Sequence, residues 1–525
     1  MAWAAWGDPD AATELPEAVV KLLREQLGVK PLPSPAVEIG DVELPDSRLS
    51  DAARSALEQA VGADGLSEDH DLRLRRALGR STPDLLRLRA GDASSAPDAV
   101  LSPDSHEAVM ATLRACVEHK IAVVPFGGGT SVVGGLDPRR EGFTAVIALD
   151  MGRLDKLMEL DEVSRMAKLG PGLRGPAAEA LLAEHGYTLG HFPQSFEYAT
   201  IGGFAIARSS GQASAGYGRF DANVVGLTVA TPQGELDLGR APMSAAGPDL
   251  RQLIMGSEGA FGVLTSVTAR LRKAPAKRVY DGWRFGSFQE GAAALRALIQ
   301  DGPTPTVLRL SDEAETAVNL ARPGEVGEGG AGGCLAIAGY EGEPDAVEAL
   351  REAGTAALEG LGGQGLGPEV GDGWVNGRYR GPYLRDALLG VGALAETLET
   401  ATFWSRIPAL YDGVRTALTE SLGGQGTPAI VLCHISHVYP TGASLYFTVV
   451  SAQLDDPIAQ WHKAKAAACD AILAAGGTIS HHHAVGTDHR PWYEREVGPL
   501  AIEALQAVKS RLDPDGILNP GVLVP

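Results

Sequence analysis

The sequence predicts an α+β fold, with two main domains that follow a helical N-terminal extension. Its length of 525 residues is more than a single hydrophobic core usually holds. Over residues 93–275, short apolar runs alternate with helical patterns. Residues 276–475 combine strand-like runs with long Ala-rich helical patterns, which predicts a second α+β domain.

The extension, residues 1–92, is predicted to consist of helices joined by proline-rich connections. Residues 16–28 place Pro near the start, apolar side chains at helical spacing and Gly at the end, all of which are helix boundary signals. Residues 69–79 show a similar pattern. The proline-rich residues 30–46 between them predict an extended linker.

The two domains contain recognisable elements in order. In the first, residues 99–103, 121–124 and 144–151 predict strands, and residues 105–120 predict an amphipathic helix. In the second, residues 335–340 and 446–450 predict strands and residues 345–361 a helix. The glycine-rich residues 324–333 and 360–373 predict loops, and residues 499–512 predict a long helix near the end of the chain.

The most informative stretch is the sequence VPFGGGTSVVGG, residues 124–135. Three consecutive glycines follow a predicted strand, and their backbone N–H groups can approach a ligand closely because no Cβ intervenes. A concave run of N–H groups binds anions, and the sequence predicts a pyrophosphate here. A glycine-rich surface turn is the alternative interpretation.

Two common phosphate loops are excluded. A Walker loop needs a Lys after the glycines, and none follows. A Rossmann fingerprint needs a helix directly after the glycines, but residues 132–142 contain three more glycines and Pro138.

Composition limits the classes of partner and the compartment. The net charge of −21 and pI of about 5.0 argue against nucleic acid and against electrostatic docking on anionic lipid, while a local basic pocket for a phosphorylated substrate stays compatible with them. Four separated cysteines, no signal peptide and no apolar run of membrane-spanning length predict a cytoplasmic protein.

Several motifs together resemble the vanillyl-alcohol oxidase superfamily of flavoproteins. The glycine loop PFGGGTS, the segment PQSFEYATIGGFAIARSSGQAS (residues 193–214), the segment MGSEGAFGVLTSVTARL (residues 255–271) and the ending DPDGILNPG match its pattern. The resemblance implies a PCMH-type FAD-binding domain over residues 93–275, completed by residues 476–525, and a cap domain over residues 276–475. It also implies non-covalent FAD at the interface of these domains.

The resemblance places the cofactor on three segments of the chain. The implied cofactor-binding residues are Pro125, Phe126, Gly127, Gly128, Gly129, Thr130, Ser131, Gln194, Ser195, Thr200, Gly202, Gly203, Ala207, Arg208, Ser209, Ser210, Glu258, Gly259, Gly262 and Val263.

Within the superfamily the chain is similar to the alkyldihydroxyacetonephosphate synthase family. The two tryptophans of MAWAAWG, LGHFPQSFEYATIGG with His191, TVLRLSDE with Arg309 and PYLRD with Arg385 match that family. GASLYF with Tyr446 and GGTISHHHAVG with His481, His482 and His483 match its catalytic segments. This family replaces the acyl group of a fatty-acyl dihydroxyacetone phosphate by a fatty alcohol without net redox, through flavin N5, in ether lipid synthesis.

The resemblance assigns roles that the residue types can perform. Tyr446 is the expected base, and neighbouring cations must lower its pKa from about 10 for it to act at pH 7. His482 is the expected proton-transfer or leaving-group partner. Arg385 and Arg309 suit a phosphate, although Arg309 could instead hold the cap against the flavin domain. His191 is expected near the flavin.

The residues alone leave simpler interpretations open. Tyr446 on a strand-like run could be a packing residue, the arginines could form surface salt bridges, and His191 could be a satisfied loop histidine. On an extended segment, His482 would face away from His481 and His483. Two histidines at this spacing could begin a zinc site, but no third ligand at a fixed spacing is evident, so we expect no metal.

Two other functions compete with the synthase. One is an FAD-linked oxidase or dehydrogenase of a 2-hydroxy acid or alcohol; the other is a non-catalytic FAD-binding protein. The EHG pattern usual in 2-hydroxyacid dehydrogenases is replaced here by HHH, which favours the synthase. The partners we expect are a lipid-like phosphorylated small molecule and a second copy of the chain in a homodimer, without nucleic acid. Peripheral membrane contact is compatible with these expectations.

Overall fold

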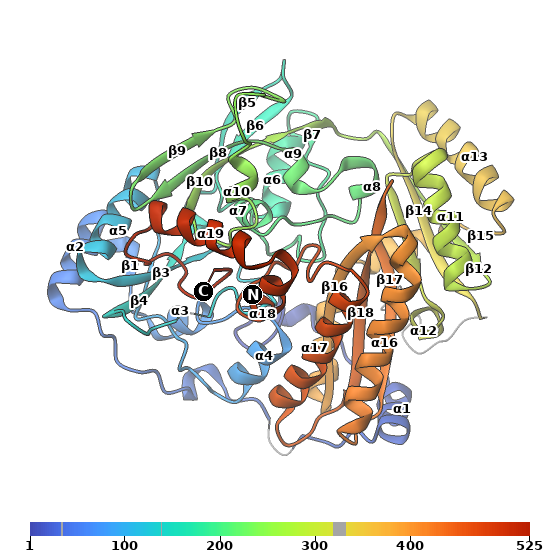
Figure 1. Cartoon of the computed structure of the whole chain (residues 1–525), viewed down its shortest axis with the longest axis horizontal. Coiled ribbons are helices and arrows are strands. Elements are labelled where there is room, and N and C mark those ends of the chain that lie inside the picture. The colour runs from blue at the N-terminus through green and yellow to red at the C-terminus, as the bar shows by residue number, and fades with distance from the viewer. Residues whose placement is uncertain (33–34, 138, 319–331, 525) are drawn as a thin grey trace.

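The computed structural model describes residues 1–32, 35–137, 139–318 and 332–524 (Figure 1). It confirms the predicted mixture of helices and sheets, with one large sheet in the second domain and two smaller main sheets in the first. No helix of the described residues is long and apolar enough to cross a membrane.

The first domain begins with a four-stranded sheet that ends at the glycine loop. Its order is β1(Leu66–Ser67), β2(Ala99–Leu101), β4(Ala145–Asp150), β3(Ile121–Phe126), and the last three strands are parallel. Helix α5(His106–His119) connects β2 to β3, as the amphipathic pattern of residues 105–120 predicts, and packs on α2(Asp51–Val61). The buried, near-continuous apolar strands are typical of a parallel sheet covered by helices.

A five-stranded antiparallel sheet forms the second part of this domain. Its order is β5(Leu157–Asp161), β6(Met166–Leu169), β10(Val263–Arg270), β8(Val224–Thr231), β9(Gly234–Leu238). The accompanying elements are α6(Gly175–Ala183), β7(Tyr187–Thr188), α7(Ile201–Ile206), α8(Ser214–Tyr217), α9(Phe220–Asn223), α10(Arg251–Ile254) and β11(Arg272–Lys273).

The end of the chain returns to this domain. Helices α18(Arg490–Val497) and α19(Pro499–Leu512) precede a segment in which Leu518 forms an isolated parallel bridge to Val123 of β3. The side-chain amide of Asn519 then donates hydrogen bonds to the carbonyls of Gly135 and Glu258, at 3.1 and 2.7 Å. One C-terminal residue therefore ties together the glycine loop and a second cofactor segment.

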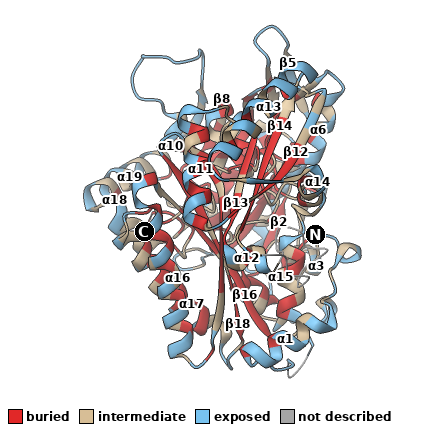
Figure 2. Cartoon of the chain, turned by 90° about the vertical axis from the view of Figure 1, so that its right-hand side faces the viewer, coloured by how far each residue is buried: buried red, intermediate tan, exposed pale blue. Residues whose placement is uncertain are grey.

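The second domain is a seven-stranded antiparallel sheet with helices on one face. Its order is β15(Gln364–Gly367), β12(Lys277–Phe285), β14(Cys334–Gly342), β13(Val307–Ser311), β17(Ala429–Tyr439), β18(Gly442–Ala452), β16(Ala393–Phe403). Helices α11(Phe288–Asp301), α13(Pro344–Gly360), α16(Ile407–Gly424) and α17(Pro457–Ala474) contribute to its main hydrophobic core, and the short α12(Glu313–Ala317) follows β13. Figure 2 shows buried residues concentrated on the central strands and the inner faces of these helices.

The opposite face of β16–β18 carries smaller elements and faces the first domain. Helix α15(Gly381–Gly390) and the N-terminal helix α1(Glu17–Leu27) share a hydrophobic cluster with β16 and β18. In Figure 1, α1 accordingly lies beside the second domain, away from the other N-terminal elements. Helix α4(Thr82–Arg89) contacts α17 and β16, and α3(His70–Arg75) contacts β2, so residues 1–92 are distributed over both domains.

Several local predictions need correction or lie outside the described residues. The prediction that residues 360–373 form a loop is wrong, because they contain β15 and the start of α14(Pro368–Gly377), which pack on β12. Residues 324–331 of the other glycine-rich stretch lie outside the described residues. The domain boundaries stay predictions; the one at residue 276 falls between β11 and β12.

Candidate active site

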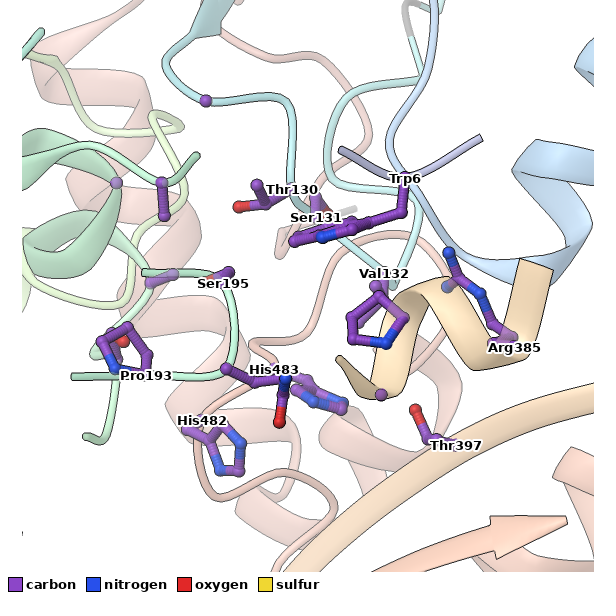
Figure 3. A pocket seen from close by; sticks show the side chains of 18 of the residues that line it. Trp6, Thr130, Ser131, Val132, Pro193, Ser195, Arg385, Thr397, His482 and His483 are labelled. Atoms are coloured by element: carbon purple, nitrogen blue, oxygen red, sulfur yellow. The ribbon is translucent and has the colours of Figure 1, made fainter. Parts of the chain in front are cut away.

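A cavity of about 430 Å³ lies between the two domains and brings most of the predicted site residues together. The first domain contributes the glycine loop, residues 193–212 and residues 258–264; the second contributes α15, β16–β18 and Arg309, and His482–Ala484 close one side. Figure 3 shows Ser131, Ser195, Arg385 and His482 arranged around this space. Its size and its position between domains are typical of a ligand site.

The glycine loop is a cradle that only glycine can build. A Cβ on Gly128 would lie 2.1 Å from the carbonyl oxygen of Tyr198, and one on Gly127 would lie 2.5 Å from Thr200 Oγ1. Gly129 has a φ of +68°. The N–H groups of residues 128–131 donate no hydrogen bond to another described residue. Unpaired N–H groups that line a cavity require an acceptor from outside the chain, and a diphosphate fits this requirement.

Glu258 joins the cradle to the C-terminal segment. Its carboxylate accepts hydrogen bonds from the backbone N–H groups of Val485 (3.0 Å) and Gly486 (2.9 Å). Burial raises the pKa of Glu258 to about 7, although those hydrogen bonds act in the opposite direction. Its φ of +52° lies in the left-handed region, so this non-glycine residue holds a strained conformation beside the cavity.

Of the residues implied for the cofactor, two do not line the cavity. Arg208 instead donates to the carbonyls of Met255 (2.9 Å) and Gln252 (2.7 Å), and Ser210 contacts His437 Nδ1 at 3.1 Å. The lining residues among the predicted set are Pro125, Phe126, Gly127, Gly128, Gly129, Thr130, Ser131, Gln194, Ser195, Thr200, Gly202, Gly203, Ala207, Ser209, Glu258, Gly259, Gly262 and Val263. Arg208 and Ser210 therefore support the cavity wall from behind.

The three histidines curl around one buried carboxylate. The backbone N–H groups of His481, His482 and His483 all donate to Glu399 Oε1, at 2.8–3.0 Å, as does the Ser480 hydroxyl at 2.7 Å. The expectation that the side chains alternate on an extended segment is wrong, since these residues form a bend. Burial alone would raise the pKa of Glu399, but His482 and its neighbours hold it well below the usual range.

Only two of the three histidines line the cavity. His482 and His483 do so, whereas His481 lies behind them and contacts Tyr439 OH through Nε2 at 2.7 Å and His482 Nδ1 through Nδ1 at 3.0 Å. Burial lowers the pKa of His481 well below its usual range and that of His483 to about 3. Both rings are therefore neutral near pH 7.

His481 and His482 also belong to the one metal-type cluster within the described part of the chain. One nitrogen from each of them and from His437 lie within 4.8 Å of one another. However, His437 Nδ1 is already held by the hydroxyls of Ser210 and Ser214, at 3.1 and 2.8 Å. The absence of a metal stays a prediction.

Tyr446 occupies the centre of a polar row on the sheet. The strand register places it opposite Glu399 on β16 and His434 on β17, and its ring stacks on His434 at 4.9 Å between centroids. Burial raises the pKa of Tyr446 to about 12, and the effect of Arg385 is smaller. The expectation that cations lower this pKa is therefore wrong for the chain without its ligands.

Both predicted arginines line the cavity, and both already have carboxylate partners. Arg309 pairs with the fully buried Glu315, which also accepts from His434 Nδ1 at 2.8 Å. Burial alone would raise the pKa of Glu315, but His434 and Arg309 lower it to about 2. Arg385 pairs with Asp386 at 3.2 Å and donates to the carbonyl of Arg80 at 2.6 Å.

His191 does not line the cavity. It is buried against Phe204 and Phe220, and its Nε2 contacts Ser209 Oγ at 3.0 Å. Burial lowers its pKa to about 3, so the ring is neutral. The structure gives His191 a supporting position behind Ser209, which does line the cavity.

Trp6, one of the two tryptophans of MAWAAWG, lines the cavity and packs edge-on against Tyr198 at 5.7 Å. Three residues of the site were not singled out from the sequence: Arg378, His434 and Glu399. Arg378 lines the cavity between α14 and α15. His434 and Glu399 flank Tyr446. Strand alternation around residues 395–399 and 430–434 could have placed the last two on one face, but it could not have shown that the strands pair with this register.

The fold and the cradle together define a flavoprotein of the FAD-linked oxidase class. The family model "FAD binding domain" matches residues 97–238, and the model "FAD linked oxidases, C-terminal domain" matches residues 274–523. FAD is therefore the cofactor of this chain, and the cradle of residues 127–131 has the unpaired N–H groups to hold its diphosphate.

Curated relatives define the family further. The chain is 30% identical over 567 residues to an alkyldihydroxyacetonephosphate synthase of Trypanosoma brucei brucei, covering 100% of this chain and 92% of the relative. It is 32% identical over 514 residues to the enzyme of that name from Dictyostelium discoideum, covering 94% and 84%. A solved alkyldihydroxyacetonephosphate synthase superposes with a TM-score of 0.83 at 27% identity, over 99% of this chain and 98% of that one. The chain belongs to the alkyldihydroxyacetonephosphate synthase family.

Proposed function

We propose that this enzyme exchanges the acyl group of an acyl dihydroxyacetone phosphate for a fatty alcohol, which forms an ether lipid precursor and releases a fatty acid. The C1–O bond to the carboxylate breaks, the C1–O bond to the alcohol forms, and the alcohol proton leaves with the fatty acid. No oxidant or reductant is consumed.

The observation that carries this proposal is a change from polar to apolar along one face of the sheet. The row of His434 and Tyr446 is followed by Thr397, Thr448 and Leu432, and then by Ala395, Val450 and Ile430. All eight side chains belong to residues that line the cavity. Four residues of strand span about 14 Å. The cavity therefore has a polar reacting end beside Tyr446 and an apolar arm that leads away from it.

Helices complete the apolar arm. Leu384 and Leu388 of α15 and Val19, Leu22 and Leu23 of α1 line it opposite the strands. Leu22 is 45% exposed, so the arm reaches the surface near α1. A hydrocarbon chain gains about 0.8 kcal/mol for each CH₂ that it buries, which makes such an arm a site for long alkyl chains.

The residues at the polar end have assignable roles. When bound, FAD supplies the nucleophilic nitrogen N5. Tyr446 removes the C1 proton and returns it, and a bound cationic or hydrogen-bond-donating neighbour must lower its pKa first, because the phenol is otherwise protonated up to about pH 12. His482 donates a proton to the departing carboxylate, and Glu399 holds the backbone of His482 in place at 3.0 Å.

The experiment uses FAD-loaded enzyme, labelled acyl dihydroxyacetone phosphate and hexadecanol. We expect Tyr446→Phe and His482→Ala to abolish exchange while the flavin stays bound, and Glu420→Gln, on the exposed side of α16, to leave it unchanged. Full exchange activity in either site variant would refute the role of that residue.

Anaerobic absorbance spectroscopy separates the competing functions. A transient flavin change with acyl dihydroxyacetone phosphate, without consumption of an electron acceptor, supports exchange. Lasting reduction by a 2-hydroxy acid would instead identify a dehydrogenase, and bound flavin without either response would identify a binding protein.

Four further properties belong to this proposal: non-covalent FAD, a homodimer, a cytoplasmic location and peripheral membrane contact. Acid precipitation should release all the flavin into the supernatant. Light scattering tests the dimer, cell fractionation tests the location, and flotation with phosphatidylcholine vesicles tests the membrane contact.

A further inference from the structure

One cation of the cavity has no counter-charge among the residues that the structure describes. Three arginines line the cavity, and two of them, Arg309 and Arg385, pair with Glu315 and Asp386. Among the described residues, no carboxylate lies within ion-pair distance of the third, Arg378. Its Nε and Nη1 atoms are buried and have no hydrogen-bond partner in the described chain. A buried guanidinium without a partner is unfavourable unless an anion from outside completes it.

Aromatic rings hold this guanidinium in place. The Cζ atom of Arg378 lies 5.2 Å from the ring centroid of Phe192, 5.9 Å from that of Trp374 and 5.0 Å from that of Tyr379. Such cation–π contacts fix the orientation of the side chain but accept no hydrogen bond from its edge. The donors along the edge therefore stay available to a ligand with several oxygen atoms.

Other unpaired donors and a helix end lie in the same region. The hydroxyl of Tyr379 and Nε2 of Gln194 are also buried without a partner in the described chain. Helix α15 begins at Gly381, which lines the cavity, and no side chain caps its first turn. The carboxylate of Glu341 accepts hydrogen bonds from the hydroxyls of Tyr217 and Tyr280. The region is thus rich in donors and in positive potential.

The segment that contains Ser210 and Gln212 connects Arg378 to the histidine region. Gln212 donates from its side-chain amide to the carbonyl of Arg378 at 3.3 Å, while Ser210, two residues earlier, contacts His437 beside His482. Two residues of chain span at most about 7 Å. Arg378 and His482 both line the same cavity, and this segment connects the two regions.

We infer that Arg378, between Phe192, Trp374 and Tyr379, is the anchor for the phosphate of the substrate. The inference rests on the proposed function insofar as it takes the substrate to be a phosphate monoester. The inference assigns the phosphate to Arg378 rather than to Arg309 or Arg385, because the charges of these two arginines are neutralised by Glu315 and Asp386. The bidentate edge of a guanidinium matches two phosphate oxygens, which a lysine does not.

The test compares Arg378→Gln and Arg378→Lys with the control Arg380→Gln. Arg380 is exposed in the same turn and donates to the carbonyl of Ala11, so the control removes the same charge two residues away. The probes are dihydroxyacetone phosphate, neutral dihydroxyacetone and inorganic phosphate, titrated into FAD-loaded enzyme by calorimetry. The Kd for FAD is measured for each variant by fluorescence.

We expect Arg378→Gln to weaken dihydroxyacetone phosphate binding about 10- to 100-fold, because the variant loses hydrogen bonds between charged groups. The affinities for dihydroxyacetone and for FAD should not change. Arg378→Lys should recover part of the loss, and inorganic phosphate should compete with dihydroxyacetone phosphate in the unmodified enzyme. This competition also tests the inference if Arg378→Gln does not fold.

Two results would overturn the inference. One is an unchanged affinity of Arg378→Gln for dihydroxyacetone phosphate. The other is an equal loss of affinity for FAD and for dihydroxyacetone phosphate, which would make Arg378 a cofactor residue. Its failure is distinguishable from that of the proposed function. Exchange activity with unchanged phosphate binding in Arg378→Gln would refute the anchor alone, whereas Arg378-dependent phosphate binding without exchange would refute the proposed reaction alone.

Discussion

Glu399→Gln should disrupt the active site more than any other isosteric change on the sheet. The carboxylate is 1% exposed and receives the N–H groups of His481, His482 and His483 together with the Ser480 hydroxyl. An amide keeps one acceptor oxygen, loses the other and turns an NH₂ group toward these donors. The substitution therefore weakens the hydrogen bonds that hold the backbone of all three histidines in the bend.

The magnitude follows from the number and kind of these hydrogen bonds. Each hydrogen bond to a charged group contributes about 1.5–3 kcal/mol, and removal of one partner from a buried charged network costs about 3–5 kcal/mol. We expect a loss of unfolding free energy in that range at pH 7. Exchange activity should fall at least about 100-fold, because a displacement of about 1 Å at a reacting group has this effect.

The assay is urea unfolding monitored by tryptophan fluorescence at pH 7 and pH 4, with Glu420→Gln as the exposed control. The pKa of Glu399 is lowered on folding, so its stabilising contribution is complete above about pH 4.5 and is lost as the pH falls through the lower folded-state value. The difference in unfolding free energy between the parent chain and Glu399→Gln should therefore be smaller at pH 4 than at pH 7. A variant as stable and as active as the parent at pH 7 would refute the reasoning.

Three further predictions follow from the site. Gly128→Ala should weaken FAD binding at least about 100-fold in a fluorescence titration, because its Cβ would meet backbone 2.1 Å away, while Gly413→Ala, with nothing within 4 Å, should bind FAD normally; equal affinities would contradict this. In an ultraviolet pH titration, the phenolate absorbance of Tyr446→Phe should match that of the parent up to about pH 11, because burial raises the pKa of Tyr446 to about 12. A smaller phenolate absorbance in the variant than in the parent below about pH 10 would contradict this prediction. Elemental analysis should find no stoichiometric zinc, because the hydroxyls of Ser210, Ser214 and Tyr439 already occupy ring nitrogens of His437 and His481; one zinc per chain would overturn this.

Sequence patterns predict the elements whose signals are local. The predicted helix at residues 499–512 and the one at residues 105–120 agree with α19 and α5 within a residue at each end. Periodic apolar side chains, a Ser before the first turn and Pro at the helix start suffice for them. The glycine loop after β3 was equally predictable, because three consecutive glycines allow the backbone to approach a ligand closely.

Elements that depend on tertiary packing were not predictable in the same way. Residues 360–373 have the composition of a loop, yet β15 pairs with Trp283 and Arg284 of β12 and α14 packs on that strand. The glycines there permit close approach: a Cβ on Gly371 would lie 2.2 Å from the carbonyl of Tyr280. Composition alone does not distinguish glycines needed for close packing from glycines of a flexible loop.

In the site too, local motifs could be predicted, whereas features that depend on tertiary packing could not. The resemblance supplied Tyr446 and His482, but the bend around Glu399 depends on a carboxylate 82 positions earlier than His481. Burial reversed the expected pKa change of Tyr446, and burial is a property of the fold. Arg378 carries no motif of its own; only its lack of a counter-charge among the described residues, visible in three dimensions, sets it apart from Arg309 and Arg385.

The hydrogen bonds of Asn519 have a consequence for how the holoenzyme is made. This side chain joins the carbonyls of Gly135 and Glu258, and Leu518 bridges to the strand before the glycines. During synthesis, the coenzyme pocket can close only after residue 519 has left the ribosome exit tunnel. We therefore expect nascent chains stalled before Ile517 to remain colourless with FAD in excess, so that flavin loading waits for the synthesis of residues 517–519.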